Sequence, residues 1–229
     1  MISPDLQAGE IEVLGRLVDA SNATLLCEIK SASGEFKVIY KPVAGERPLW
    51  DFPDGNLAHR EVAAYRVSEL LGLHVVPETI LREGPFGLGS VQRWIDVDEE
   101  LDIVAIAQSK SFAMEKITLF DAIVNNTDRK FGHILPISET EIYGCDHGLT
   151  FHSEDKLRTV LWQFSGDQIP DNFLKSLNIF LDLLPKSQII DLLTDDEILA
   201  LQNRVTDLIE AGTYPFPSDE WPSVPWPPF

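Results

Sequence analysis

Apolar and polar positions alternate through the opening part of the chain, which is the pattern of strands that bury one face. Residues 12–18 alternate in this way, and β-rich segments follow at 24–29 and 36–40. Ser33-Gly34 separates the last two segments and is typical of a turn. The pattern predicts that the chain opens with a three-stranded antiparallel meander.

One helix and two further strands are expected next. Residues 57–71 have helical spacing, with Asn56 as the predicted N-cap and the glycine directly after them as the stop. Strands are expected at 74–81 and 89–95, and the glycine-rich segment 84–89 is expected to be a hairpin between strands.

The second half changes to helical periodicity. Residues 111–125 are predicted to form a helix, and short strands are expected at 134–135 and 142–143. A capping box at Thr194 predicts a helix that runs to Gly212. Strands followed by helices indicate an α+β fold with two lobes and a hinge near residues 94–98.

The charge balance narrows the classes of partner. The chain has 18 Lys and Arg against 37 Asp and Glu, which gives a formal charge of −19. The electrostatic field of such a negatively charged protein repels nucleic acid and anionic lipid surfaces. No apolar run is long enough for a transmembrane segment, and the first residues lack the features of a secretory signal. Two cysteines, Cys27 and Cys145, are too few for a disulfide framework and fit a reducing, cytoplasmic location as small buried thiols.

Four polar residues occur in the order, and on the element types, that phosphoryl transfer from a nucleotide needs. Lys41 ends a predicted strand, and Glu61 lies in the helix that follows. Asp128 follows a helix, and Asp146 follows the short hairpin. Each residue alone is more often a solvated charge or a turn residue, so the prediction depends on their joint occurrence.

Longer segments carry a family pattern. They are Ile39-Tyr40-Lys41-Pro42, Glu61-Val62-Ala63-Ala64-Tyr65 and Leu71-Gly72-Leu73-His74-Val75-Val76-Pro77-Glu78-Thr79, with Asn126-Thr127-Asp128-Arg129 and Asp146-His147-Gly148-Leu149-Thr150-Phe151 in the second half. Together they resemble the phosphatidylinositol 3/4-kinase-like superfamily, most closely the type II phosphatidylinositol 4-kinases and more distantly the HipA-like kinases. Residues 21–27 and 45–55 resemble a compact actinobacterial subfamily of phosphatidylinositol-kinase-like proteins. The resemblance spans residues 10–165 and implies a protein-kinase-like fold.

The resemblance also implies roles for single residues. Lys41 would bind the nucleotide phosphates, with Glu61 as its ion-pair partner. Asp128 would be the catalytic base, and Lys130 would lie near the transferred phosphate. Asp146 would be the principal metal ligand.

Two further segments would hold the nucleotide. The hinge segment 91–95 would meet the adenine, and its Gln92 and Trp94 are the candidate contacts. The turn at 19–24 would cover the phosphates through Ser21, Asn22 and Thr24, although it lacks the usual glycines.

One position departs from the family pattern. Kinases place an asparagine five residues after the catalytic aspartate as a second metal ligand, and this chain has His133 there. An imidazole is a poor ligand for Mg²⁺ and suits Mn²⁺ better. His133 therefore leaves open a metal ligand, a phosphate contact or a weakened enzyme.

The expected function is ATP-dependent phosphate transfer, with Mg²⁺ or Mn²⁺, to a hydroxyl of a soluble small molecule or a protein. A lipid acceptor is disfavoured by the charge. The alternatives are a nucleotide-binding pseudokinase with a regulatory role and a nucleotidyl transferase that uses the same residues. The expected organisation is an N-lobe nucleotide clamp at 1–96 and a C-lobe at 97–213. The Pro/Trp-rich tail at 214–229 is either a docked arm or a loose end.

Overall fold

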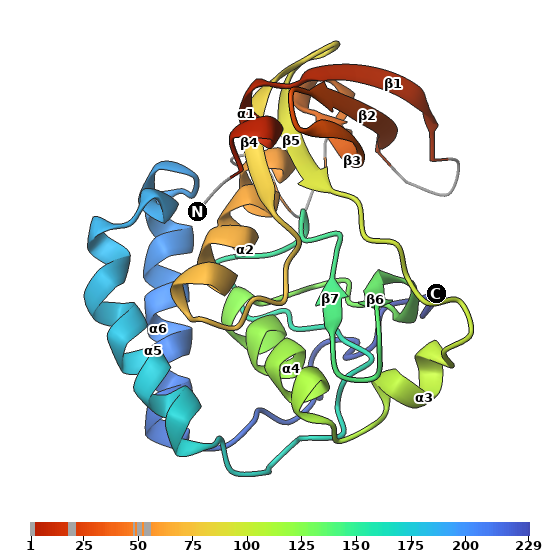
Figure 1. Ribbon diagram of the computed structural model, residues 1–229. Helices are drawn as coiled ribbons and strands as arrows, with labels where there is room; N and C mark the ends of the chain where they lie inside the picture. Colours follow the sequence, from red (N-terminus) through yellow and green to blue (C-terminus); the bar gives the residue numbers. More distant parts are fainter. Residues whose placement is uncertain (1–2, 18–21, 48, 50–51, 53–55) are drawn as a thin grey trace.

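The computed structural model describes residues 3–17, 22–47, 49, 52 and 56–229 (Figure 1). The described residues form a five-stranded antiparallel sheet with the strand order β1-β2-β3-β5-β4. The strands are β1 (Glu10–Arg16), β2 (Leu25–Ser31), β3 (Gly34–Pro42), β4 (Thr79–Gly84) and β5 (Gly87–Arg93). The expected meander is thus present, and the hairpin of β4 and β5 completes the sheet.

Alternation along β3 gives the sheet two different faces. Val38 and Tyr40 are buried in a small core that also contains Leu6 of the short helix α1 (Pro4–Ala8). Because side chains alternate along a strand, Lys41 points to the opposite face, where helix α2 lies. The sequence pattern did not predict α1, whose N-cap is Ser3.

Helix α2 (Leu57–Leu70) packs between the sheet and the rest of the molecule. Its N-cap is Asn56, whose side chain accepts a hydrogen bond from the backbone N–H of His59. The chain leaves the helix through Gly72 at φ +69°, a backbone conformation that favours glycine. A buried ion pair at 2.6 Å joins Arg60 of α2 to Glu197 and so fixes α2 against the second half of the chain.

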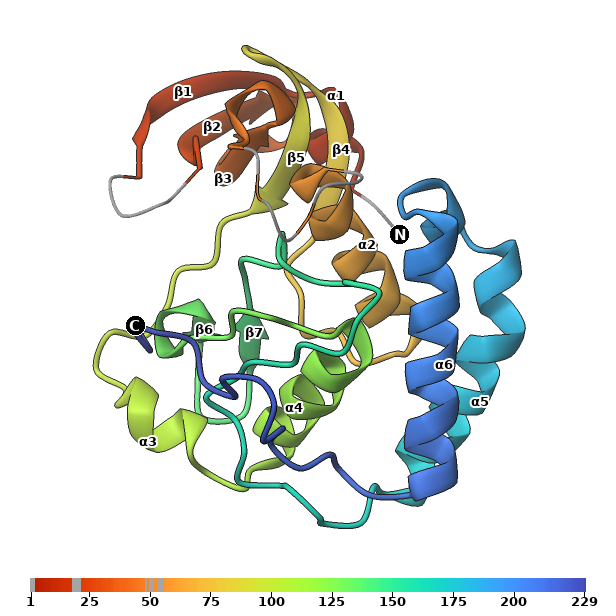
Figure 2. The ribbon, with the colours of Figure 1, turned by 180° about the vertical axis from the view of Figure 1, so that it is seen from behind.

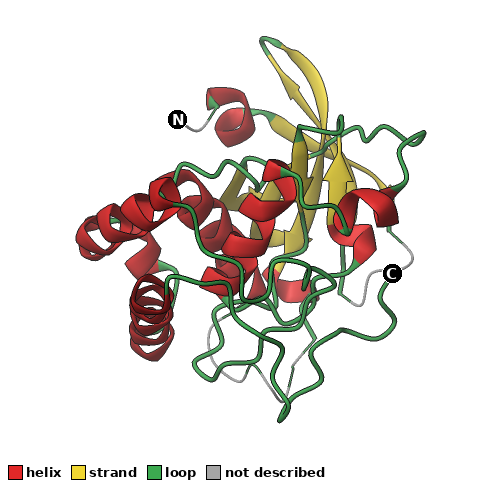
Figure 3. Ribbon diagram, turned by 90° about the horizontal axis from the view of Figure 1, so that it is seen from below, coloured by secondary structure: helices red, strands yellow, loops and turns green. Residues whose placement is uncertain are grey.

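Helices are the main regular elements of the second half (Figures 1 and 2). They surround one large apolar core, to which α2 also contributes. The helices of this half are α3 (Ile103–Ala107), α4 (Phe112–Val124), α5 (Asp171–Leu183) and α6 (Asp195–Ala211), with the hairpin β6 (Ile134–Pro136) and β7 (Ile142–Gly144). In the described part of the chain, short 3-10 turns lie at Phe131–His133, Leu184–Lys186 and Gln188–Asp191 in this half, and at Val43–Gly45 before α2. Seen from below, the longer helices lie toward the left and centre, and long loops run through the lower part of the view (Figure 3). The sheet followed by a helical body is an α+β arrangement, as the sequence predicted.

Some predicted boundaries were wrong for local reasons. The strand expected from residue 74 begins only at Thr79, because His74 has a positive φ of 52° and Pro77 cannot donate to a ladder. Cys145 follows β7 rather than lying inside a strand, and it is half-buried, whereas Cys27 is fully buried.

The tail after Tyr214 is docked on the helical body. The backbone N–H of Thr159 donates to Ser223 O at 3.0 Å, and that of Phe131 donates to Pro228 O at 2.8 Å. The tail is therefore an arm docked on the surface of the helical body and not a loose end. Within the described residues, no helix is long and apolar enough to span a bilayer.

Candidate functional site

Lys41 joins the sheet, helix α2 and the segment after β7. Its Nζ forms ion pairs with Glu61 Oε1 and, at 2.8 Å, with Asp146 Oδ1. Burial by itself would lower the pKa of Lys41, but the two carboxylates outweigh burial and raise its pKa well above the usual value. The ammonium group is therefore charged and held in place.

Glu61 is held by two donors. It lies in the second turn of α2, its side chain is only 3% exposed, and its Oε2 accepts a hydrogen bond from the backbone N–H of His147 at 3.1 Å. Its other carboxylate oxygen binds Lys41. The glutamate therefore fixes both the lysine and the segment after Asp146.

Asp146 has a backbone conformation that is unusual for its residue type. Its φ of 59° lies in the left-handed region, directly after β7. Its Oδ1 faces Lys41, and its Oδ2 lies 3.5 Å from His133 Nε2. The charge of Lys41 holds the pKa of the Asp146 carboxyl well below its usual range. Asp146 is therefore an anion that faces a cation on one side and an imidazole on the other.

The loop that carries Asp128 follows α4, which ends at Asn125 in the left-handed conformation. The Asp128 backbone N–H donates to Asn126 Oδ1 at 3.0 Å, and its carboxylate lies 3.4 Å from Lys130 Nζ. Burial raises the pKa of the Asp128 carboxyl, while the nearby Lys130 lowers it.

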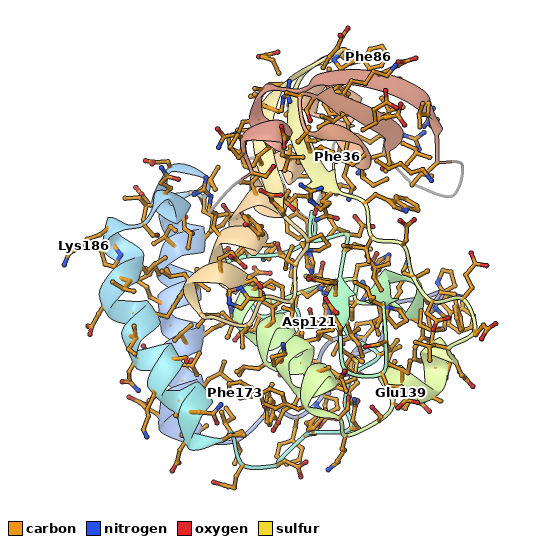
Figure 4. All side chains as sticks on the ribbon, in the orientation of Figure 1. Phe36, Phe86, Asp121, Glu139, Phe173 and Lys186 are labelled. Atoms are coloured by element: carbon orange, nitrogen blue, oxygen red, sulfur yellow. The ribbon has the colours of Figure 1, made fainter. Side chains whose placement is uncertain are left out.

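A buried ion pair anchors this loop (Figure 4, where Asp121 is labelled in the interior). The guanidinium group of Arg129 is fully buried and forms two hydrogen bonds of 2.9 Å to the Asp121 carboxylate. The same guanidinium donates to the carbonyl oxygens of His133 and Cys145, each at 3.1 Å. Arg129 therefore ties α4, the loop of Asp128 and the segment of Asp146 into one unit.

These segments enclose a cavity of about 340 Å³. Its lining includes the four residues expected to act together, and also Asn22 and Thr24. The complete described lining is Asn22, Ala23, Thr24, Lys41, Pro42, Glu46, Arg47, Leu49, Leu57, Ala58, Glu61, Asp128, Asp146, Gly148 and Leu149. The structure therefore brings Lys41, Glu61, Asp128 and Asp146 to one cleft between the sheet and the helical body.

Several expected site residues lie elsewhere. Gln92 is buried and its amide donates to Thr79 Oγ1 at 2.8 Å. The Trp94 indole donates to Asp96 at 2.9 Å. Within the described part of the chain, neither Gln92 nor Trp94 lines the 340 Å³ cavity. Ser21 lies outside the described residues.

Sequence reasoning missed two charged residues of the described cavity lining, Glu46 and Arg47. Glu46 accepts hydrogen bonds from the backbone N–H groups of Leu57, at 3.0 Å, and Ala58, at 2.8 Å. It therefore caps the helix that carries Glu61. Arg47 adds an exposed cation to the lining. No helix periodicity or spacing rule marks either residue, because the role of Glu46 depends on its position beside the first residues of α2, eleven and twelve residues later in the chain.

The donor set for a metal is small. Among the described residues, no group of three or more His, Cys, Asp or Glu side chains is placed to hold a metal ion. Asp146 and His133 offer one oxygen and one nitrogen at 3.5 Å from each other. Such a pair fits a divalent cation whose remaining ligands are phosphate oxygens and water.

Comparison with known proteins places the chain in a family. No family model matches the chain. It is 38% identical over 262 aligned positions to Protein Rv2133c of Mycobacterium tuberculosis, and the match covers 98% of this chain and 94% of that protein. The chain belongs to the family of Protein Rv2133c.

Solved structures of kinases share the fold. A structure of hydra Fam20 with sugar is similar over 90% of this chain and 86% of the Fam20 chain, with a TM-score of 0.59 and 13% sequence identity. The structure of the Golgi casein kinase with Mn/ADP bound is similar over 90% of this chain and 73% of the casein kinase chain, with a TM-score of 0.56 and 13% sequence identity. The proinflammatory kinase CtkA of Helicobacter pylori is similar over 93% of this chain and 95% of the CtkA chain, with a TM-score of 0.51 and 12% sequence identity. This member of the Rv2133c family therefore has a kinase-like fold.

Proposed function

We propose that the protein is an ATP-dependent, metal-dependent phosphotransferase. The observation that carries this proposal is the convergence of Lys41, Glu61, Asp128 and Asp146, from four separate segments, on one cavity of about 340 Å³. Phosphoryl transfer depends mainly on positioning and on neutralising phosphate charge, and these side chains supply both.

Each side chain has a role that its contacts support. Lys41, held by Glu61, would bind nucleotide phosphates. Asp128 would accept the proton of the attacking hydroxyl, since burial raises its pKa and makes it a better base. Lys130, at 3.4 Å from Asp128, would contact the transferred phosphate.

Asp146 and His133 would hold the divalent cation. A bound Mg²⁺ or Mn²⁺ would offset the negative charge of the phosphates. The imidazole of His133 favours Mn²⁺, and the similar Golgi casein kinase has been solved with Mn/ADP bound.

The remaining nucleotide contacts are also proposed. Asn22 and Thr24 line the cavity beside Lys41 and would contact the phosphates. Ser21, which lies outside the described residues, would do the same. The segment 91–95 would meet the adenine, and Trp94 would have to leave Asp96 to stack on the ring. In this scheme residues 1–96 are the N-lobe clamp, residues 97–213 the C-lobe, and residues 214–229 the tail.

The acceptor would be a hydroxyl of a soluble small molecule or of a protein. The charge of −19 opposes approach to an anionic bilayer, so the phosphatidylinositol branch of the superfamily would supply the fold but not the substrate.

A pseudokinase is the second candidate, and His133 favours it because this residue replaces the usual asparagine ligand. Nucleotidyl transfer would use the same lysine and cation, so only the product separates it from phosphate transfer.

The test is a thermal-shift series with ATP and MnCl₂ or MgCl₂, followed by transfer assays with γ- and α-labelled ATP. At 100-fold excess over the dissociation constant, ligand binding adds about 2.7 kcal/mol. For a chain of this size this corresponds to a rise in Tm of about 5–11 °C. Lys41→Met and Asp146→Asn should abolish the rise, whereas Lys37→Met, an exposed lysine on the same strand, should keep it.

The outcomes separate the candidates. Transfer of the γ-label supports phosphotransfer, and transfer of the α-label shows nucleotidyl transfer instead. A thermal shift without turnover supports the pseudokinase. No shift with either cation would refute nucleotide binding altogether.

A further inference from the structure

A second cavity, of about 440 Å³, lies in the helical body. It is formed by the end of α6, residues 155–162 and the docked tail, and none of its described lining residues belongs to the Lys41 cavity. Its apolar wall is mostly aromatic and consists of Leu157, Trp162, Leu208, Tyr214, Phe216 and Trp221. A concave apolar site with a few polar groups is typical of small-molecule binding.

Arg204 is the polar group that most needs a partner at this wall. It is only 8% exposed, its Nε donates to Ile123 O at 3.1 Å, and its Nη1 donates to His152 O at 3.1 Å. Its Nη2 is buried and has no hydrogen-bond partner among the described residues. A buried guanidinium donor without an acceptor is unfavourable, so an acceptor from a ligand would complete it.

A second donor at the same wall is also incomplete. The indole Nε1 of Trp221 is buried and lacks a partner in the described part of the chain. The Trp221 ring lies beneath two cations, with Lys156 Nζ at 5.3 Å and Arg158 Cζ at 5.9 Å from its centroid.

Carboxylates lie nearby as well, since Asp155 and Asp207 line the cavity. Arg204 Nη1 lies 3.8 Å from Asp155 Oδ1, and Lys156 is paired with Glu154 at 3.0 Å. The two buried donors without a partner among the described residues, Arg204 Nη2 and Trp221 Nε1, are therefore what favours a hydrogen-bond acceptor here.

We propose that this cavity binds a small aromatic carboxylate. Its ring would lie between the aromatic side chains of Trp162 and Trp221, and its carboxylate would accept hydrogen bonds from Arg204 and Trp221. A planar carboxylate can accept two parallel hydrogen bonds from a guanidinium group, whereas a hydroxyl cannot. The inference rests on this wall alone and is independent of the proposed phosphate transfer.

The cavity also touches the loop of Asp128. Asn125, which lines it, caps α4 directly before that loop. Its side chain donates to His152 O at 3.0 Å and to Glu154 O at 2.7 Å, and accepts from the backbone N–H of Lys156 at 2.9 Å. A ligand bound at Arg204 would therefore lie next to residues 152–156, the segment that the Asn125 side chain holds by these three hydrogen bonds.

The experiment is calorimetric titration of the full chain with 2-naphthoate and with the matched neutral compound 2-naphthylmethanol. We expect the carboxylate to bind at least tenfold more tightly than the alcohol. Ala211→Phe fills the cavity without removing any bond of Arg204 and should abolish binding. Glu210→Phe, the neighbouring exposed residue on α6, should leave binding unchanged.

Arg204→Lys tests the guanidinium itself. The lysine keeps the positive charge but cannot donate two parallel hydrogen bonds to a carboxylate, so the ratio of 2-naphthoate to 2-naphthylmethanol affinity should fall about tenfold. If that variant does not fold, Ala211→Phe still decides the question. Equal affinity for acid and alcohol, binding that survives Ala211→Phe, or no binding of either compound to the wild type would each overturn the proposal.

Discussion

Replacing Asp121 by asparagine tests the central anchor of the site. The carboxylate is 1% exposed and accepts from Arg129, whose guanidinium is fully buried, and from Asn126 Nδ2 at 2.9 Å. Removing one partner of a buried pair costs about 3–5 kcal/mol, because the remaining charge is left without compensation. Arg129 keeps the carbonyls of His133 and Cys145, so we expect the lower end, about 3 kcal/mol.

Urea and thermal denaturation measure this cost. For a chain of 229 residues, about 3 kcal/mol corresponds to a fall in Tm of about 6–12 °C. The control is Asp167→Asn, which breaks an ion pair to Lys110 at the surface, where the two side chains are 45% and 57% exposed. That variant should lose less than about 1 kcal/mol.

A double-mutant cycle separates the ion pair from its surroundings. Arg129→Met alone leaves the Asp121 carboxylate buried, and the double variant leaves neither charge. The two single losses should exceed the double loss by about 2 kcal/mol. The reasoning is refuted if the losses simply add, or if Asp121→Asn costs no more than Asp167→Asn.

The remaining predictions concern the cavity around Lys41. Glu46→Ala removes the acceptor of two N–H groups at the start of α2 and should cost about 1 kcal/mol in urea denaturation; an unchanged midpoint contradicts that cap. Asp128 must be deprotonated to act as a base, so the acid limb of the pH–rate profile should lie above the pKa of an ordinary aspartate, since burial raises the Asp128 pKa. Lys130→Met removes a charge that lowers the Asp128 pKa and should move that limb to still higher pH; a move to lower pH excludes Asp128 as the base. His133→Asn should lower the ratio of Mn²⁺- to Mg²⁺-supported activity, and an unchanged ratio means that His133 does not bind the cation.

The parts of this fold that the sequence predicted are those set by local patterns. Alternation identified the meander, and the Asn56 cap and the Thr194 capping box marked two helix starts, because each feature is encoded within a few residues. The convergence of Lys41, Glu61, Asp128 and Asp146 was predicted from their order along the chain together with a family resemblance.

What the sequence did not predict depends on how distant segments meet. Arg129 looked like part of a turn, yet it is fully buried and paired with Asp121, because the chain turns at Asn125 and brings Arg129 back against the last turns of α4. Likewise, Glu46 acquires its role only because its carboxylate lies beside the backbone N–H groups at the start of α2. The second cavity requires the tail to dock beside α6, and a proline-rich composition does not determine where an arm binds.

The charges of the Lys41 cavity explain why a nucleotide and a cation would bind together. Among the described residues, the lining carries Lys41 and Arg47 against four carboxylates, those of Glu46, Glu61, Asp128 and Asp146, and Lys130 adds one more cation beside Asp128. Burial lowers the pKa of His133 and favours its neutral imidazole, so the described side chains carry a formal charge of minus one when all four carboxylates are ionised. A nucleotide triphosphate alone would meet net repulsion, whereas one divalent cation reverses the sign. Asp146 has one oxygen against Lys41 and the other toward His133, so the same carboxylate can face the lysine and the cation at once.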